Sequence, residues 1–320
     1  MKMKKIKKHK TSKIDNTDQQ NSIEKLNSVM INFAREMAKE IKANAVLAYV
    51  DMVGSKENLK SLLKESRCIL AVRKQEVVDE LIAMDVPDDR IVRVPYINLS
   101  RSSRVKVAVL LALSKKLIQK EDRIICLSGS PKYGTFDNLT VLDVNRELEI
   151  FSSRGLEIAN QIEMPVVFDH LLTIVMELAE EGKEGKPLGT TFVLGDHEKV
   201  MELSSQLVFN PFASVPEKKR NIMDFKLKET LREFAAIDGA FVIRNDGVIL
   251  AAGRHLDASA DIADLPQGLG ARHRSAAGIT ALSDAIALVM SESTGDVRIF
   301  SKGRIFMEIE RDIMRQEEAG

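Results

Sequence analysis

The sequence predicts an α/β fold in two domains, and three observations support it. The chain has 320 residues, enough for two separate cores. Its first half alternates short apolar runs with amphipathic helices, which predicts a Rossmann-like parallel sheet covered on both faces. Its second half mixes hairpin signals with helices, which predicts a mixed β-sheet flanked by helices. We place the domains at residues 23–150 and 151–320, with a boundary near 146–159, and expect a basic disordered tail at residues 1–22.

The first half is predicted to start with one helix and to continue with strands and helices in alternation. Helical periodicity covers residues 23–41. Apolar runs predict strands at residues 45–50, 68–72, 91–94, 123–127 and 140–144. Periodic stretches between the first four predict helices at residues 56–64, 75–84 and 103–118.

The second half carries the hairpin signals. An Asn-Asp-Gly turn at residues 245–247 separates two apolar runs, which is typical of a β-hairpin. Leu227, Leu231 and Phe234 recur on one helical face. Helices are predicted at residues 165–181, 225–235 and 280–287. Strands are predicted at residues 189–194, 240–243, 248–252, 288–291, 297–301 and 304–309.

Composition limits the classes of partner. Basic and acidic residues both number 47, which argues against a dedicated polyanion binder. Residues 1–13 hold seven lysines and no acidic residue; we interpret them as a solvated tail, with weak nucleic-acid or membrane-surface contact as the alternatives. We find neither a signal peptide nor an apolar run of membrane-spanning length. Cys68 and Cys126 lie in apolar strands, as expected for reduced, buried thiols, so we expect a cytoplasmic protein.

The segment Asp238-Gly239-Ala240 is the first candidate for chemistry. A carboxylate at the start of a strand can hold Mg²⁺ or Mn²⁺ beside a phosphate, or orient an attacking hydroxyl. Gly239 leaves room for a sugar or a ring against the main chain. The alternative is a simple Asp-Gly turn, so this segment taken alone does not decide the function.

A second candidate is the Arg272-His273-Arg274 stretch within residues 270–280. Guanidinium groups match phosphate oxygens, and Ser275 with the following amides can open a helix, whose N-terminus favours phosphate. The alternative is a solvated basic turn. Residues 291–295 follow an apolar strand with hydroxyls and a carboxylate, which suit either a metal or phosphate site or a polar turn.

In order and spacing these segments resemble the diadenylate cyclase (DAC) domain, the catalytic domain of the DNA-integrity-scanning DisA family. The resemblance covers about residues 160–310. It rests on residues 189–196, 210–212, 238–240, 270–280 and 291–295. The first two of these segments look structural, and we assign them no chemistry. The resemblance implies an enzyme that condenses two ATP molecules into cyclic di-AMP and releases two pyrophosphates.

The resemblance also implies roles for individual residues. Asp238, Arg272, His273 and Arg274 would be catalytic, and Asp238 would bind Mn²⁺ or Mg²⁺, with His273 or Glu292 as a further ligand. Contacts with the nucleotide would come from Gly239, Ala240, Leu256, Ala271, Arg272, His273, Arg274, Ser275 and Ser291. The chain departs from the family at Ala271 and Ser275, where threonine is frequent, and at Ser293, where glutamate is frequent. The Ala271 departure would remove one phosphate contact of the family, and we still expect activity.

The N-terminal half, residues 23–147, resembles the C-terminal α/β domain of pyruvate kinase. This resemblance rests on residues 126–131 and 137–141. Such a domain joined to a DAC domain is similar to the archaeal-type DacZ family. The loops at residues 51–55 and 129–130 follow strands, where such folds bind ligands. These two loops have three interpretations: ordinary turns and helix caps, an effector site, or an oligomer contact.

The leading hypothesis is therefore a metal-dependent diadenylate cyclase. Because its product is two-fold symmetric, we expect two DAC domains to face each other in a homodimer or a higher oligomer. The alternative is a catalytically weak sensor that binds ATP or cyclic di-AMP. A nucleic-acid-associated scaffold has only the lysine-rich tail in its favour, so we expect no membrane partner and no nucleic-acid partner.

Overall fold

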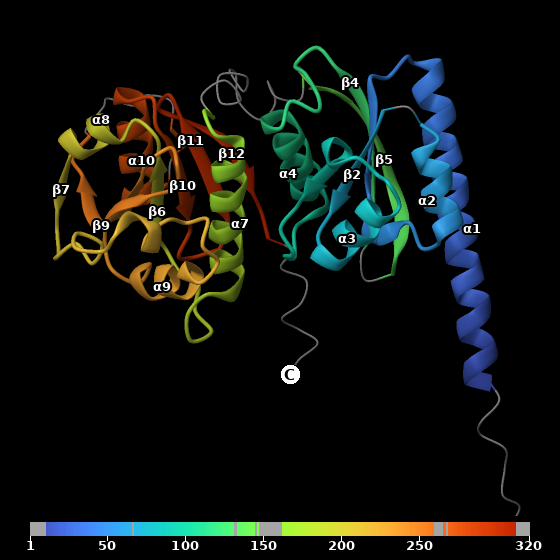
Figure 1. Cartoon of the computed structure of the whole chain (residues 1–320), viewed down its shortest axis with the longest axis horizontal. Helices are drawn as coiled ribbons and strands as arrows, with labels where there is room; N and C mark the ends of the chain where they lie inside the picture. Colours follow the sequence, from blue (N-terminus) through green and yellow to red (C-terminus); the bar gives the residue numbers. More distant parts are fainter. Residues whose placement is uncertain are drawn as a thin grey trace, which may run out of the picture. The chain divides into compact units, whose positions relative to one another are not determined.

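The chain forms two compact units. The structure is a computed structural model that describes residues 11–65, 67–130, 133–144, 146, 162–258, 265–266 and 268–311 (Figure 1). One unit comprises Met1–Arg93 and Asp122–Asp143, and the other Val94–Glu121 and Val144–Gly320. Helix α4 (Arg101–Ser114) thus groups with the C-terminal unit, although its sequence position lies within the predicted first domain. Most of the predicted boundary, 146–159, lies outside the described residues.

The N-terminal unit contains a five-stranded sheet in the order β3-β2-β1-β4-β5. Its strands are β1 (Ala45–Tyr49), β2 (Cys68–Val72), β3 (Ile91–Arg93), β4 (Arg123–Ser130) and β5 (Thr135–Asp143). The first four strands are parallel, as predicted, but β5 is antiparallel to β4. The reason is the short connection: β5 begins five residues after β4 ends, whereas a parallel crossover needs a dozen or more.

Helices accompany this sheet, and the first is longer than predicted. They are α1 (Thr11–Glu40), α2 (Lys56–Leu63) and α3 (Gln75–Ala83), with the short 3₁₀ segments η1 (Val50–Met52) and η2 (Asp88–Arg90). Figure 1 shows α1 extending well past the sheet at its N-terminal end. The prediction of a disordered tail at residues 1–22 is therefore wrong from Thr11 onward. No Pro or Gly interrupts α1, so its polar first part continues the helix.

A fully buried amide, Asn27, ties α1 to the sheet. Its Nδ2 donates to the carbonyl oxygens of Met52 at 2.6 Å and Gly134 at 2.8 Å, and its Oδ1 accepts from the Phe136 N–H at 2.8 Å. One side chain thus joins α1 to the segment that follows β1 and to the segment that leads into β5. Asn58 reinforces this contact by donating to the carbonyl oxygen of Glu24 at 3.2 Å.

The C-terminal unit contains a seven-stranded mixed sheet in the order β12-β11-β10-β6-β8-β9-β7. Its strands are β6 (Thr191–Leu194), β7 (Ser204–Gln206), β8 (Ala240–Ile243), β9 (Ile249–Leu256), β10 (Ile286–Met290), β11 (Val297–Ser301) and β12 (Arg304–Ile309). Only β6 and β8 pair in parallel, and the remaining neighbours are antiparallel. The mixed sheet and the α/β class are confirmed.

Besides α4, the helices in the described part of this unit are α7 (Pro165–Glu181), α8 (His197–Glu202), α9 (Leu227–Phe234) and α10 (Ala271–Leu282), with the 3₁₀ segment η3 (Glu217–Lys219). The helix predicted at residues 280–287 is wrong: α10 ends at Leu282, and β10 has begun by Ile286. Ser283 ends the helix in an extended conformation, where its hydroxyl accepts from the Ala285 N–H at 3.3 Å. None of the helices in the described part of the chain is long and apolar enough to cross a membrane.

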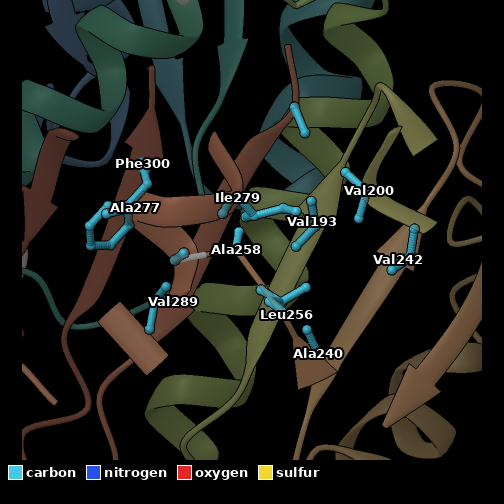
Figure 2. Packing of buried hydrophobic residues seen from close by; sticks show 13 residues of the cluster. Val193, Val200, Ala240, Val242, Leu256, Ala258, Ala277, Ile279, Val289 and Phe300 are labelled. Carbon is cyan, nitrogen blue, oxygen red and sulfur yellow. The ribbon is translucent and has the colours of Figure 1, made fainter. Parts of the chain in front are cut away.

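The core of the C-terminal unit lies between α10 and the sheet. Figure 2 shows Ala277 and Ile279 of α10 packed among side chains from β6, β8, β9, β10 and β11. Gly278 permits this close packing, because a Cβ there would lie 2.0 Å from the Ala258 carbonyl oxygen. The packing fixes α10, and with it the position of the arginine-containing first turn.

In the other unit, Cys68 and Cys126 are buried free thiols, and burial raises the pKa of each to about 12.

Candidate active site

A cavity of about 730 Å³ opens at the edge of the second sheet where the parallel strands β6 and β8 begin. Four segments meet there: the chain that leads into β8, the start of α10 with the residues before it, the end of β10 with the turn after it, and one side chain of β11. The lining residues are Asp238, Gly268, Leu269, Gly270, Ala271, Arg272, His273, Met290, Ser291, Glu292, Ser293, Thr294 and Arg298. The fold therefore brings together segments up to 60 residues apart in the sequence, counted from Asp238 to Arg298.

Arg272 connects two carboxylates in this cavity. Its Nη1 donates to Oε2 of Glu292 at 2.8 Å, and its Nη2 lies 3.7 Å from Oδ1 of Asp238. Gly189 makes room for the pair, since a Cβ there would lie 2.7 Å from Cβ of Glu292 and 2.8 Å from Nη1 of Arg272. About two-thirds of the Arg272 side chain is covered, while the side chains of Asp238 and Glu292 are mostly exposed. This arrangement presents one fixed cation and two accessible anions to a ligand.

Asp238 is held at the mouth of the cavity by its own backbone neighbour. Its Oδ1 accepts from the Gly239 N–H at 2.9 Å, and Thr190 donates to the Gly239 carbonyl oxygen at 3.3 Å. Gly239 adopts a φ of 108°, which favours glycine. With 83% of its side chain exposed, Asp238 can bind a hydroxyl or a cation that enters the cavity.

His273 lines the cavity, although most of the residue is buried. Its Nε2 is 3.0 Å from Nη1 of Arg298. Burial is the main cause that lowers the pKa of His273 to about 4, and the positive charges of Arg298 and Arg272 add to it, while Glu308 opposes the shift. The imidazole is therefore neutral at neutral pH.

Two other predicted residues of α10 bond to nearby main chain. Nη1 of Arg274 donates to the carbonyl oxygen of Leu269, and the Ser275 hydroxyl donates to that of Arg272 at 3.1 Å. Ala240 and Leu256 are buried in the core of Figure 2 and do not line the cavity. The structure thus gathers Asp238, Ala271, Arg272, His273, Ser291 and Glu292, with Gly239 alongside, and it leaves Arg274, Ser275, Ala240 and Leu256 off the cavity lining.

Comparisons with known proteins identify the family of this site. Residues 177–305 match the family model described as "DisA bacterial checkpoint controller nucleotide-binding", and residues 26–151 match "Probable sensor domain DacZ_P". A diadenylate cyclase from Methanocaldococcus jannaschii is 30% identical over 87% of this chain and 95% of its own length. One from Haloferax volcanii is 35% identical over 70% of this chain and 81% of its own length. The chain belongs to the diadenylate cyclase family.

Among solved structures, a double mutant of DacA from Staphylococcus aureus is 24% identical, with a TM-score of 0.29, over 46% of this chain and 86% of that chain. Family membership confirms the resemblance drawn from residues 189–196, 238–240 and 270–280. The matched nucleotide-binding region includes every residue that lines the cavity. The sequence-based roles of the individual residues stay predictions.

The metal expected for a member of this family can be tested against the side chains present. The described residues contain no group of three or more His, Cys, Asp and Glu side chains that could hold a metal ion. Mg²⁺ is often held by one or two carboxylates together with substrate phosphates and water. Asp238 and Glu292 fit that pattern, since both are accessible and flank one guanidinium. His273 fits it poorly, because its Nε2 faces Arg298.

Sequence reasoning missed several lining residues: Gly268, Leu269, Met290 and Arg298. Arg298 carried a signal, because it is the one charged residue in strand β11, whose other members are buried. A charged side chain in a buried strand needs a partner. The sequence alone does not show that this partner is His273, 25 residues away.

Proposed function

We propose that this protein is a diadenylate cyclase that condenses two ATP molecules into cyclic di-AMP and releases two pyrophosphates. The observation that carries the proposal is the position of Arg272 between Asp238 and Glu292 in a cavity within the nucleotide-binding region. Such a cavity offers a guanidinium to phosphate oxygens and carboxylates to a hydroxyl or a cation. Family membership adds the reaction class.

In the proposed reaction, the 3′-hydroxyl oxygen of one ATP attacks the α-phosphorus of the other. The new P–O bond forms as the bond to the β-phosphate oxygen breaks, and pyrophosphate leaves. A second attack with the roles exchanged closes the ring. Asp238 orients the attacking hydroxyl and takes up its proton, and Arg272 neutralises the charge that develops on the α-phosphate oxygens.

Glu292, a bound metal ion and Gly239 would also support this chemistry. A phosphate group that binds Arg272 competes with Glu292, which then becomes available to a cation. A divalent metal, when bound by Asp238 and Glu292, would lower the pKa of the hydroxyl and polarise the phosphate. Gly239 leaves space beside the main chain for the ribose.

The two-fold symmetry of the product implies two copies of the cavity, each with one ATP, facing each other across a two-fold axis. The rate per subunit is then expected to fall on dilution below the dimer dissociation constant. Analytical ultracentrifugation over the same protein concentrations measures the dimer dissociation constant with which the fall in rate is compared. A rate per subunit that stays constant through full dissociation would rule out the paired site.

The decisive experiment incubates the full-length protein with ATP and Mn²⁺ or Mg²⁺ and detects cyclic di-AMP by mass spectrometry. Asp238→Asn should lower the rate at least about 100-fold, since a positioned base contributes that much. Asp224→Asn, on a surface turn, is the matched control and should keep full activity. ATP binding without any product would favour the second candidate, a sensor of ATP or cyclic di-AMP, which the sensor-domain match in the N-terminal half supports.

A further inference from the structure

Arg298 lines the cavity from β11 and makes two contacts on opposite sides. Its Nη1 lies 3.0 Å from Nε2 of His273, and its Nη2 forms an ion pair with Oε1 of Glu308. Glu308 stands directly opposite Arg298 in the register of β11 and β12. Only 17% of the Arg298 side chain is exposed, and 37% of the Glu308 side chain.

The contact with His273 constrains the chemistry of the imidazole. A guanidinium stays protonated at any pH that a folded protein tolerates, and it has donors but no acceptor. Nε2 of His273 must therefore act as the acceptor, which requires that it carry no hydrogen. A neutral imidazole with a bare Nε2 carries its hydrogen on Nδ1. The ion pair with Glu308 restrains the same guanidinium through its Nη2.

We propose that Arg298 is a positioning residue that fixes His273 as the tautomer with its hydrogen on Nδ1. His273 also lines the cavity, and Nδ1–H is then the only hydrogen-bond donor of its side chain. An uncharged donor in a fixed orientation can bind a phosphate or ribose oxygen without exchanging a proton with it. The link to catalysis rests on the proposed cyclase function, whereas the tautomer assignment does not.

The test uses the full-length protein labelled with ¹⁵N-histidine, whose nitrogen chemical shifts distinguish the two tautomers. The chain has five histidines, and the spectrum of His273→Gln identifies the signals of His273. In the wild type, Nδ1 should be protonated and Nε2 bare. Arg298→Met, which keeps an apolar stem and removes the donor, should give a mixture of tautomers. Arg298→Lys should restore the wild-type pattern, since an ammonium also only donates.

Kinetics with ATP provide the second measurement. Arg298→Met should lower kcat about 10- to 100-fold, as loss of an orienting partner does, with KM for ATP changed less than about threefold. Arg298→Lys should recover part of the lost kcat. Lys302→Met removes a nearby surface charge between β11 and β12 and should change neither the tautomer nor kcat.

Two results would overturn the proposal. One is an unchanged Nδ1–H tautomer in Arg298→Met, because another group would then set it. The other is wild-type kcat in Arg298→Met with an altered tautomer, because the tautomer would then have no role in turnover. If the wild type makes no cyclic di-AMP, the proposed function fails, while the spectra still decide the tautomer. If Arg298→Met does not fold, as seen by circular dichroism, a mixture of tautomers in Arg298→Lys would overturn the assignment.

Discussion

Gly239 approaches Gly253 so closely that a Cβ on Gly239 would lie 2.6 Å from the carbonyl carbon of Gly253. Gly239 directly precedes β8 and Gly253 lies in the neighbouring strand β9, where the pairing shifts register between Ala240 and Val242. This contact sets where β8 begins, and it therefore fixes Asp238 at the mouth of the cavity. Both glycines have positive φ angles, 108° and 68°.

Gly239→Ala should destabilise the protein and displace Asp238. A non-glycine residue at this φ costs about 1–3 kcal/mol, and the contact with Gly253 adds to that loss. Gly185→Ala is the matched control, because Gly185 has a φ of 76° but open space around it. The free energy of unfolding in urea measures both. Equal losses for the two variants would show that the approach of Gly253 contributes nothing.

Asn27→Leu should destabilise the N-terminal unit by at least about 2 kcal/mol. Leucine has similar volume but leaves the carbonyl oxygens of Met52 and Gly134 and the Phe136 N–H without this partner. Asn32→Leu on the same helix is the control, since the contact of Asn32 with Ser61 is exposed. Urea unfolding measures the difference, and comparable stabilities for the two variants would contradict the structural role of Asn27.

The raised pKa of Asp169 predicts that the stability of the fold depends on pH. Burial raises its pKa from 3.8 to about 6, although the Ser114 hydroxyl donates to its Oδ1 at 2.8 Å. Between these two values the folded protein holds a proton that the unfolded chain has released, so stability falls as pH rises. The loss approaches about 3 kcal/mol above pH 6. Asp169→Asn should abolish it and stabilise the protein at pH 7.

Urea unfolding of wild type and Asp169→Asn at pH 4 and pH 7 measures this contribution. Asp79→Asn, which changes an exposed carboxylate bonded to Gln75, should leave the pH dependence as it is in the wild type. A wild-type difference between the two pH values that survives in Asp169→Asn would assign the effect to other groups.

The sequence predicted those helices and strands whose own residues show a clear apolar or periodic pattern. The apolar runs of β1 and β2 and the helix at Pro165–Glu181 lie where periodicity placed them. The sequence-based prediction failed where contacts with a distant part of the chain decide the structure. The start of α10 depends on packing of small residues against the sheet, as Gly278 against Ala258 shows, and small residues give little periodic signal.

The same distinction applies to the cavity. Asp238 and Arg272 were predicted because their residue types suit phosphate chemistry, and the structure places them 3.7 Å apart. Arg298 was missed, since only the pairing of β10, β11 and β12 brings it to His273 and Glu308. Ala240 and Leu256, for which the resemblance implied nucleotide contacts, are buried in the core, on the inward side of their strands.

The buried amide of Asn27 has a consequence for the domain that matches a probable sensor. In open α/β sheets, ligands enter the crevice at the carboxyl ends of the strands, where the strand order reverses. Here that point lies between β1 and β4, and Asn27 bonds to the chain on both sides of it. Asn27 therefore joins α1 to both flanks of this point, so a ligand that displaced its amide would also release α1 from the sheet.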